Sequence, residues 1–346
     1  MKTMVKLLIP VLGIAVASPA LAGTLTVDCN RGGTITKALE KAKPFDTIKV
    51  TGTCKEKFTI TTDRLTLDGQ GSAILDAGGG FHAGAIFHGA ITIDGARGVT
   101  VTGFTIQHGP DGITCKRGAA CLVRNSTLQD NADEGMQVSE NSTAEVTDST
   151  FRRNGEWGIV VFDNSSLLFH GTVNLTHNGQ SGLGVLFTST AGSFSGATIH
   201  FDNNKEHGIF VVGGSMVQID RQGGTVTMDN NKKNGVGLSD SVFMLWAGTL
   251  SIARNGGNGI YVGGHSSVRD FGATWHIKDN KGKGVAVENG GDVTMSGATI
   301  TGNSVDVDLG YGAHATLKRN AIGTIACDKN SRIIGDTACP GFAVTR

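Results

Sequence analysis

A recurring pattern of polar and apolar positions organises this sequence. Each copy begins with Asn, continues with three small or polar residues and Gly, and ends with two apolar residues separated by one position of any type. The copies start at Asn131, Asn154, Asn178, Asn204, Asn231, Asn255 and Asn280, and a degraded copy starts at Asn303. The steps between these asparagines are 23, 24, 26, 27, 24, 25 and 23 residues. Repetition at this period predicts a solenoid, in which each repeat buries its apolar side only against its neighbours.

The spacing within each copy predicts strands. Apolar residues alternate after the Gly, as at Ile159 and Val161, and a second short apolar run precedes each Asn, as at 226–228. A helical solenoid would need runs of roughly ten residues with a period of about 3.6, and the repeats contain none. We therefore expect three short strands in each coil. We also expect the Asn to accept a left-handed backbone and to stack on the next Asn, and the Gly to supply a positive φ.

The N-terminal part carries a further signature. A short helix pattern at 35–42 is followed by strand patterns at 44–50, 58–60 and 65–67 and by a Gly-rich turn. Together with the repeats, this order resembles the pectin lyase-like superfamily of right-handed parallel β-helix proteins. The resemblance implies one all-β domain at 23–346: a single-stranded solenoid of three parallel sheets. It also implies an N-terminal cap and first coil at 23–71, with a short capping helix, and a C-terminal cap at 316–346.

The first 22 residues predict export. Lys2 and Lys6 precede an apolar run at 7–17, and small residues at 20–22 form a cleavage site before Gly23. No later apolar run approaches the roughly 18 residues of a membrane span. We expect a periplasmic or secreted protein without a membrane span. Its oligomeric state stays open.

Composition excludes some partners. Cleavage would remove two of the 30 Lys and Arg and none of the 30 Asp and Glu, which leaves 28 minus 30, a formal charge of −2. This balance argues against nucleic acid as a partner. The 52 Gly do not indicate disorder, because they recur at fixed turn positions between apolar runs.

Six cysteines in an exported chain indicate disulfides. They form three near pairs in the sequence: Cys29 with Cys54, Cys115 with Cys121, and Cys327 with Cys339. Spacing alone leaves a second interpretation of the middle pair, in which Cys115, Cys121 and His108 form a metal site.

The strand after each Gly presents every second side chain outward. In the middle of the rod these outward residues form an apolar stripe of Val160, Phe162, Leu186, Phe210 and Val212. Either a loop or a partner covers this stripe, or it is an open face for sugars or proteins. Trp157, Phe210 and Tyr261 are the candidate substrate-binding residues, since a flat aromatic ring matches the C–H face of a pyranose. For Trp157, burial against the next turn is the alternative.

One charged group lies where the same strands end. Lys116 and Arg117 end one strand, and Glu140 and Asp163 occupy the matching positions in the next two coils. Polysaccharide lyases of the superfamily are similar in kind: acidic residues hold calcium against a uronate carboxylate, and a Lys or Arg removes the sugar proton. The resemblance therefore implies Lys116 or Arg117 as base and Glu140 and Asp163 as Ca²⁺ ligands. Solvated turn charges that pair with one another are the alternative.

A second polar group lies on the Asn turns. It comprises Asp130, Asp133, Glu134, Arg152, Arg153, Glu156 and Trp157, with His177 and His207 on nearby turns. We interpret the two histidines as surface residues. Scattered His without a Met cluster gives little support to a role in copper-site assembly.

Known catalytic signatures are missing from the sequence. No Asp-Asp or Gly-His-Gly of the polygalacturonase-like hydrolases occurs, and neither does the Asp-Pro-His element of alginate epimerases. Because fold does not determine function, two hypotheses remain. In the first, an exported β-helix protein binds, and in a lyase-type reaction processes, an acidic or cell-surface polysaccharide. In the second, a non-catalytic surface or periplasmic protein docks a partner through its outer face.

Overall fold

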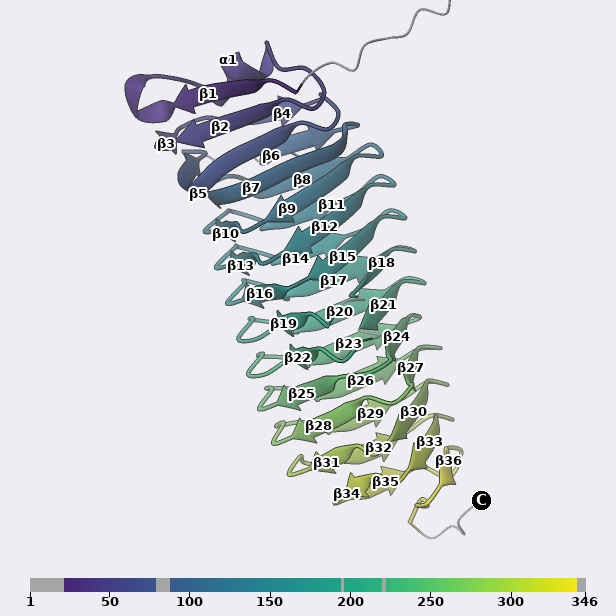
Figure 1. Cartoon of the computed structure of the whole chain (residues 1–346). Helices are drawn as coiled ribbons and strands as arrows, with labels where there is room; N and C mark the ends of the chain where they lie inside the picture. The colour runs from purple at the N-terminus through teal and green to yellow at the C-terminus, as the bar shows by residue number, and fades with distance from the viewer. Residues whose placement is uncertain (1–21, 79–87, 194–195, 220–221, 341–346) are drawn as a thin grey trace, which may run out of the picture.

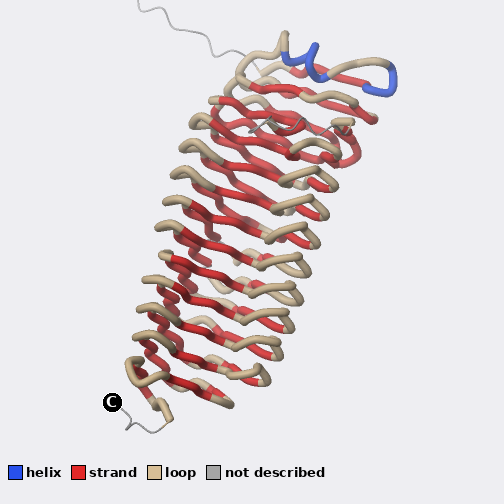
Figure 2. Tube along the Cα trace, turned by 180° about the vertical axis from the view of Figure 1, so that it is seen from behind, coloured by secondary structure: helices blue, strands red, loops and turns tan. Residues whose placement is uncertain are grey.

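The chain forms a right-handed parallel β-helix in a computed structural model that describes residues 22–78, 88–193, 196–219 and 222–340. The coils stack as a rod, with α1 at one end and β36 at the other (Figures 1 and 2). Of the signal peptide predicted at 1–22, only Ala22 belongs to the described residues. Among the helices that the structure describes, none is long and apolar enough to cross a membrane.

From β8 onward, each coil contributes three strands, one to each of three parallel ladders, which confirms the predicted fold class. Ladder 1 follows the Asn turn and comprises β4 (Phe58–Ile60), β6 (Gly89–Asp94), β8 (Asp111–Lys116), β11 (Met136–Val138), β14 (Ile159–Val161), β17 (Leu183–Leu186), β20 (Ile209–Val212), β23 (Val236–Ser239), β26 (Ile260–Gly263), β29 (Val285–Val287), β32 (Val307–Leu309) and β35 (Ile325–Cys327). Its 12 strands, spaced about 4.8 Å apart, give a rod about 53 Å long.

Ladders 2 and 3 complete the coil. Ladder 2 comprises β9 (Ala120–Arg124), β12 (Thr143–Thr147), β15 (Ser166–His170), β18 (Thr190–Ser193), β21 (Met216–Ile219), β24 (Val242–Leu245), β27 (Ser267–Asp270), β30 (Asp292–Ser296), β33 (His314–Lys318) and β36 (Arg332–Gly335). Ladder 3 comprises β10 (Thr127–Gln129), β13 (Thr150–Arg152), β16 (Thr172–Thr176), β19 (Thr198–His200), β22 (Thr225–Thr227), β25 (Thr249–Ala253), β28 (Thr274–Lys278), β31 (Thr299–Thr301) and β34 (Ala321–Ile322).

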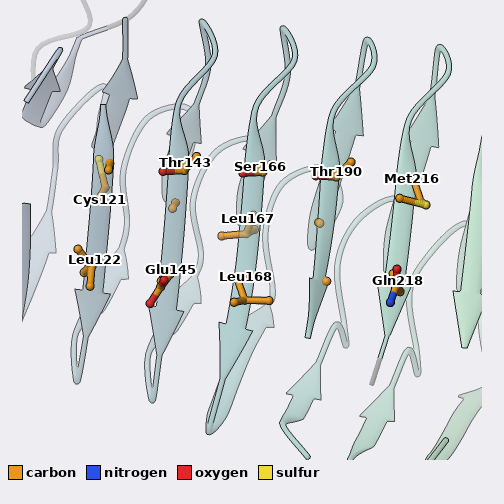
Figure 3. Close-up of a pocket in the computed structure, with 14 residues that line it drawn as sticks. Cys121, Leu122, Thr143, Glu145, Ser166, Leu167, Leu168, Thr190, Met216 and Gln218 are labelled. Carbon is orange, nitrogen blue, oxygen red and sulfur yellow. The ribbon is translucent and has the colours of Figure 1, made fainter. Parts of the chain in front are cut away.

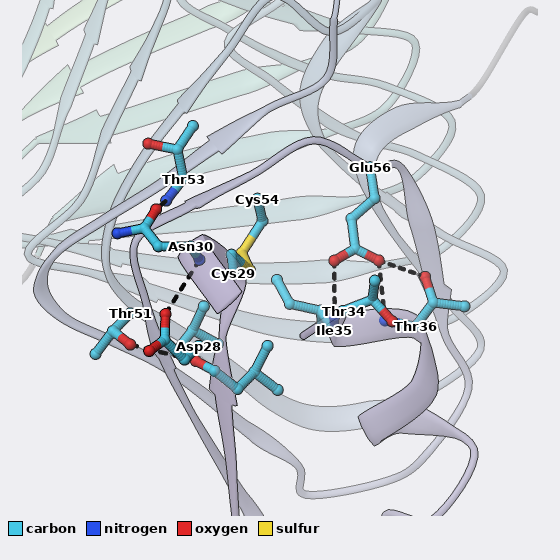
Figure 4. The surroundings of a disulfide bond; sticks show 12 residues. Asp28, Cys29, Asn30, Thr34, Ile35, Thr36, Thr51, Thr53, Cys54 and Glu56 are labelled. Atoms are coloured by element: carbon cyan, nitrogen blue, oxygen red, sulfur yellow. Dashed lines mark hydrogen bonds between the residues drawn. A yellow bond between two sulfur atoms is a disulfide. The ribbon is translucent and has the colours of Figure 1, made fainter. Parts of the chain in front are cut away.

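The N-terminal elements close the first end of the rod. They are β1 (Thr24–Asp28), a 3-10 turn (Cys29–Arg31), α1 (Ile35–Leu39), β2 (Thr47–Thr51), β3 (Thr53–Cys54), and the long strands β5 (Thr66–Asp76) and β7 (Arg97–Gln107). Strand β7 spans ladders 2 and 3, since it pairs with both β9 and β10. The helix is shorter than the predicted 35–42. Its first turn is held by the Glu56 carboxylate, which accepts from the backbone N–H groups of Ile35 and Thr36 at 2.6 and 3.0 Å (Figure 4).

Inward side chains form one continuous core. The residue after each Gly stacks in register, as for Ile113, Met136 and Ile159, and all three are buried. The largest fully buried side chains are Phe151, Phe169, Phe201, Phe243 and Trp275. Each coil can bury these groups only against its neighbours, so the solenoid prediction holds at the level of packing.

The repeated asparagines form a buried hydrogen-bonded ladder. Each side-chain amide from Asn131 to Asn280 donates from Nδ2 to Oδ1 of the next Asn, at 2.9 to 3.1 Å. The predicted backbone conformations were wrong. The left-handed residue is the one before the Asn, for example Arg153 with φ 54°. The following Gly is required by close approach, because a Cβ on Gly135 would lie 2.5 Å from the carbonyl oxygen of Gly158.

Coil length varies at one corner. From Asn131 to Asn280, ladder 1 always begins five positions after the Asn, and ladder 2 begins six or seven positions later. The distance from the start of ladder 2 to the next Asn ranges from 11 to 15 residues. The turn between ladders 2 and 3 therefore absorbs the differences in repeat length.

The C-terminal strands extend the coil beyond Tyr311. Strands β34, β35 and β36 still pair in parallel with the coil before them, so the predicted cap at 316–346 contains a further coil. All three predicted disulfides are present, with Cα–Cα separations of 5.1 Å for Cys29–Cys54, 6.5 Å for Cys115–Cys121 and 5.6 Å for Cys327–Cys339. The metal interpretation of the middle pair was wrong, and His108 instead contacts Asp76 at 3.0 Å.

Candidate functional site

The outer face of ladder 1 carries two adjacent columns of side chains. The residue before each repeat Gly forms the turn column: Asp111, Glu134, Trp157, Ser181, His207, Asn234, Asn258 and Lys283. The second residue after each Gly forms the strand column: Thr114, Gln137, Val160, Gly184, Phe210, Gly237, Tyr261, Ala286 and Asp308. Side chains of the turn column contact residues of the strand column, so the two columns act as one surface.

Three carboxylates meet at the N-terminal part of this surface. Carboxylate oxygens of Asp111, Asp133 and Glu134 lie within 4.8 Å of one another. Asp111 is 4% exposed, and its Oδ2 accepts from the hydroxyl of Thr114 at 2.8 Å. The backbone N–H of Glu134 points to Asp111 Oδ1 at 3.4 Å. Acidic side chains this close cannot all be ionised at low cost.

This crowding changes the pKa of Glu134. Burial, followed by a hydrogen bond with Asp111 and the charges of its acidic neighbours, raises the pKa of Glu134 to about 10. Burial and the charges of Asp111 and Glu156 also raise the pKa of Asp133. At neutral pH, Glu134 is therefore a carboxylic acid that can donate a hydrogen bond or a proton.

Sequence reasoning had placed Asp133 and Glu134 in a turn cluster and had missed Asp111. The turn before Asp111, which contains Gly109 and Pro110, has no repeat Asn, so the repeat pattern did not mark Asp111 as a turn residue. Aligning Gly112 with Gly135 would have placed Asp111 beside Glu134.

The four residues predicted for catalysis do not all come together. Arg117, Glu140 and Asp163 adopt left-handed turn conformations, with φ of 57°, 55° and 54°. Arg117 forms an ion pair with Asp94, and this hydrogen bond raises the pKa of the Arg117 guanidinium. Lys116, 9% exposed, ends β8 in register with Ser139 of the next coil.

Among the described residues, Glu140 and Asp163 belong to no group of three clustered candidate metal ligands. The acidic group of Asp111, Asp133 and Glu134 is such a group, and oxygen ligands suit Ca²⁺. A second group pairs Glu56 with Cys29 and Cys54, whose sulfurs are joined in a disulfide. Of the residues that the structure describes, Asp111, Asp133 and Glu134 are therefore the group whose oxygen atoms could hold a calcium ion.

Aromatic side chains continue the surface toward the C-terminal end. Trp157 lies over Gly184, where an added Cβ would come within 2.6 Å of its ring, and its centroid is 6.2 Å from that of Phe210. His207 stacks on Phe210 at 5.1 Å and lies beside Gly237. The glycines thus leave room for the rings of the turn column.

Residues of the Asn turns cover part of the apolar stripe. Trp157 and His207, from the Asn turns of the same coils, contact its central part, and Val160 is only 4% exposed. The sequence left open whether a loop or a partner covers the stripe, and these turn residues cover its central part. Trp157, Phe210 and Tyr261 remain half-buried, so part of each side chain faces outward.

Interpreting His207 as an ordinary surface residue was wrong. Burial, with a smaller contribution from the charge of Lys233, lowers the pKa of His207 to about 4. Its Nδ1 accepts from the backbone N–H of Asn234 at 3.3 Å, which places the ring proton on Nε2. His207 is therefore a neutral ring that supports Phe210.

Polar side chains lie at the C-terminal end of this surface. The Tyr261 hydroxyl donates to Glu288 at 3.4 Å, and Lys283 forms ion pairs with Asp308 and, at 3.7 Å, with Glu288. Burial and the charge of Glu288 raise the pKa of Tyr261. The remaining turn residues mostly pair locally, as Arg153 does with Asp130 at 2.7 Å.

Comparison with known proteins agrees with this architecture. Among solved structures, the A-module of the mannuronan C-5 epimerase AlgE6 from Azotobacter vinelandii has a TM-score of 0.58 and 14% identity, over 88% of this chain and 93% of that chain. A mutant of the periplasmic alginate epimerase AlgG has a TM-score of 0.57 and 14% identity, over 91% and 83%. At this identity the likeness shows the fold alone.

Sequence comparison assigns the chain to a family. No curated protein matches the chain. The family model described as "Right handed beta helix region" matches residues 89–269, more than half of the sequence. The matched segment contains the acidic group, the aromatic residues and most of the Asn ladder. The chain therefore belongs to the right-handed β-helix family.

Proposed function

We propose that this protein binds a uronate polysaccharide along the outer face of ladder 1 and transfers a proton at one of its sugar residues. The observation that carries this proposal is the neutral carboxyl group of Glu134, hydrogen-bonded to Asp111 on the surface that also presents Trp157 and Phe210. Two solved structures of the same fold are, by name, epimerases of mannuronan and alginate. Their names support the substrate class.

The geometry suits proton transfer. A sugar ring over Thr114 and Gln137 would have Asp111 and Glu134 on one side, since Asp111 contacts Thr114 directly. Lys116 lies two residues further along the same strand and faces the same way, roughly 7 Å from Thr114. Abstraction of the proton beside a uronate carboxyl group needs a base, and the negative charge that develops on that carboxyl group needs stabilisation.

Each side chain has a proposed role in that chemistry. Lys116 is the proposed base, in preference to Arg117, which is held charged by Asp94. Glu134 donates a hydrogen bond to the substrate carboxylate or returns the proton. Return of a proton to the opposite face of the sugar gives an epimer, whereas loss of the neighbouring oxygen substituent gives an unsaturated lyase product.

Calcium binding is a proposal of the same kind. Asp111, Asp133 and Glu134 would hold the ion, with Thr114 within hydrogen-bonding distance of Asp111. Bound calcium would neutralise a substrate carboxylate. Because calcium would displace the proton of Glu134, the ion would replace Glu134 as the group that neutralises the substrate carboxylate, and water would have to return the proton to the sugar. Calcium addition should then release protons in weakly buffered solution.

Solvent isotope exchange tests the proposed reaction. The purified protein is incubated in D₂O with alginate, polygalacturonate or a neutral glucan, with calcium or a chelator. Deuterium at sugar C5 is measured by NMR, unsaturated products by ultraviolet absorbance, and binding by gel retardation. We expect deuterium in a uronate polymer, loss of this signal in Glu134→Gln and Lys116→Gln, and weaker retardation in Trp157→Ala. Lys278→Gln on the outer face of ladder 3 is the matched control.

The outcomes separate the functional classes. Retardation that depends on Trp157, without isotope exchange or product, would leave a polysaccharide-binding module. Exchange that survives Glu134→Gln and Lys116→Gln would remove this site from consideration. No binding and no exchange would favour the second hypothesis, a protein that docks a partner.

A further inference from the structure

The outer face of ladder 2 carries a mixed column of side chains unrelated to the proposed site. Seven consecutive coils place these outward residues in register: Leu122, Glu145, Leu168, Gly192, Gln218, Met244 and Arg269. A parallel column holds Thr143, Ser166, Thr190, Met216, Val242 and Ser267. We call this surface the ladder 2 face.

A shallow apolar groove runs along the face. Its volume is about 370 Å³, and it extends from β9 to β21. Figure 3 shows Thr143, Ser166 and Thr190 in one row and Leu122, Glu145 and Leu168 in the row beside it. Gly192 lines the groove without a side chain, and an added Cβ there would lie 2.5 Å from the backbone oxygen of Gln218. Apolar side chains in a groove on an outer sheet face indicate a binding surface.

Glu145 lies within the groove, and the oppositely charged Arg269 lies beyond its far end in the same column. Glu145 and Arg269 are both exposed, and within the described part of the chain neither forms an ion pair. They lie five coils apart in the same column, roughly 24 Å. Leu168 and Met244 lie one coil inside these charges, and Gly192 and Gln218 lie at the centre.

We infer that the ladder 2 face binds a second copy of this chain, with the two rods antiparallel. A two-fold axis along the strand direction, midway between Gly192 and Gln218, reverses the order of the coils but keeps each column facing itself. Glu145 of one copy then faces Arg269 of the other, and Leu168 faces Met244. Gln218 faces the hollow at Gly192. Because the interface is isologous, each contact forms twice.

Other arrangements lose this complementarity. If the rods were parallel and in register, Glu145 would face Glu145 and Arg269 would face Arg269, and opposed like charges disfavour association. Shifting the antiparallel rods by one coil breaks both the charge pairing and the apolar pairing. The order of residues along one column thus selects both the direction and the register of the pair.

The size of the face predicts a weak dimer. Seven coils cover roughly 29 Å along the rod, and a ladder 2 strand covers roughly 15 Å across it. Two such faces bury roughly 900 Å² in total, just below the roughly 1,000 Å² expected of a specific interface. We therefore expect a micromolar, concentration-dependent dimer that leaves the outer face of ladder 1 accessible.

Charge reversal tests the pairing directly. Sedimentation equilibrium of the full mature chain is compared for wild type, Glu145→Arg, Arg269→Glu and the double variant. Each single variant opposes like charges at both ends of the interface, so dimerisation should weaken at least about tenfold. The double variant restores opposite pairs and should recover dimerisation to within about threefold of wild type. Lys278→Glu on ladder 3 is the control for general charge effects.

Further results decide the proposal. Leu168→Glu places a carboxylate against Met244 of the other copy and should abolish the dimer, while far-ultraviolet circular dichroism reports that the variant folds. A wild-type monomer at high micromolar concentration would overturn the inference. So would single variants that dimerise like wild type, or a double variant that fails to recover.

Discussion

Replacing Asn204 by Ala should destabilise the rod more than almost any other single polar substitution. The Asn204 side chain is fully buried in the middle of the ladder. Its Nδ2 donates to the carbonyl of Leu175 at 3.0 Å and to Asn231 Oδ1 at 3.1 Å. Its Oδ1 accepts from the backbone and side-chain N–H groups of Asn178 at 3.0 and 3.1 Å. Alanine removes all four hydrogen bonds.

The expected loss follows from these contacts. A net contribution of about 1 kcal/mol for each of the four hydrogen bonds, and a penalty of about 1 kcal/mol for the backbone N–H of Asn178 left without a partner, give about 5 kcal/mol. Asn303→Ala at the end of the ladder should cost less, about 1 to 2 kcal/mol, because Asn303 is only partly buried and water can replace its contacts. Lys205→Ala, an exposed change on the same turn, should stay within about 0.5 kcal/mol of wild type.

Denaturant unfolding and hydrogen exchange measure the effect together. Unfolding followed by circular dichroism gives the change in free energy, and exchange by mass spectrometry should show faster exchange centred on the coils of Asn178 and Asn231. Local opening is expected because each coil contacts only its neighbours. A loss below about 1 kcal/mol for Asn204→Ala, or a loss equal to that of Asn303→Ala, would refute the claim that the buried ladder holds the coils together.

Three further predictions concern buried groups. Because burial raises the pKa of Glu134 above its unfolded value, stability should fall as pH rises from about 4.5 towards 10, and Glu134→Gln should remove this part of the dependence in melting curves. Because burial lowers the pKa of His207 to about 4, stability should fall as pH drops from about 6.5 to 4. If the difference in melting temperature between His207→Gln and wild type stays constant over that pH range, His207 is not a buried neutral ring. Trp275→Phe should change stability by no more than about 1 kcal/mol, since the buried Nε1–H has no hydrogen-bond partner among the described residues and its loss offsets the small cavity; a loss above about 3 kcal/mol in denaturant would contradict this.

The sequence predicted those features that repeat. Alternation at Ile159 and Val161 indicated inward and outward faces. Near-neighbour spacing identified all three disulfides: Cys29 and Cys54 are 25 residues apart, about one coil, whereas Cys115–Cys121 and Cys327–Cys339 close short stretches of 6 and 12 residues. The repeated Asn indicated a ladder but not which residue takes the left-handed backbone. That residue varies in type, from Arg153 to His177, so no single amino acid marks it.

The candidate site was less predictable. Asp111 lies before the first clear repeat, and its contact with Glu134 depends on how the turn side chains lean over the strand of the neighbouring coil. The same lean places His207 beside Gly237 of the next coil. Sequence spacing defines which coil a residue occupies, whereas these contacts depend on the direction of each side chain. Glu140 and Asp163 take matching left-handed turn positions in successive coils, but neither belongs to a group of three candidate metal ligands among the described residues.

Insertions at the variable corner between ladders 2 and 3 should have a different effect from insertions elsewhere in the coil. Chain added there lengthens an outer turn and leaves the Asn ladder and both faces in place, as the coils of 23 to 27 residues already illustrate. One residue added between an Asn and its Gly would instead shift every outward side chain of that ladder 1 strand into the core. New surface features can therefore be acquired at one edge of the molecule without disturbing the outer face of ladder 1, which makes this edge the natural position for a fused peptide or an inserted domain.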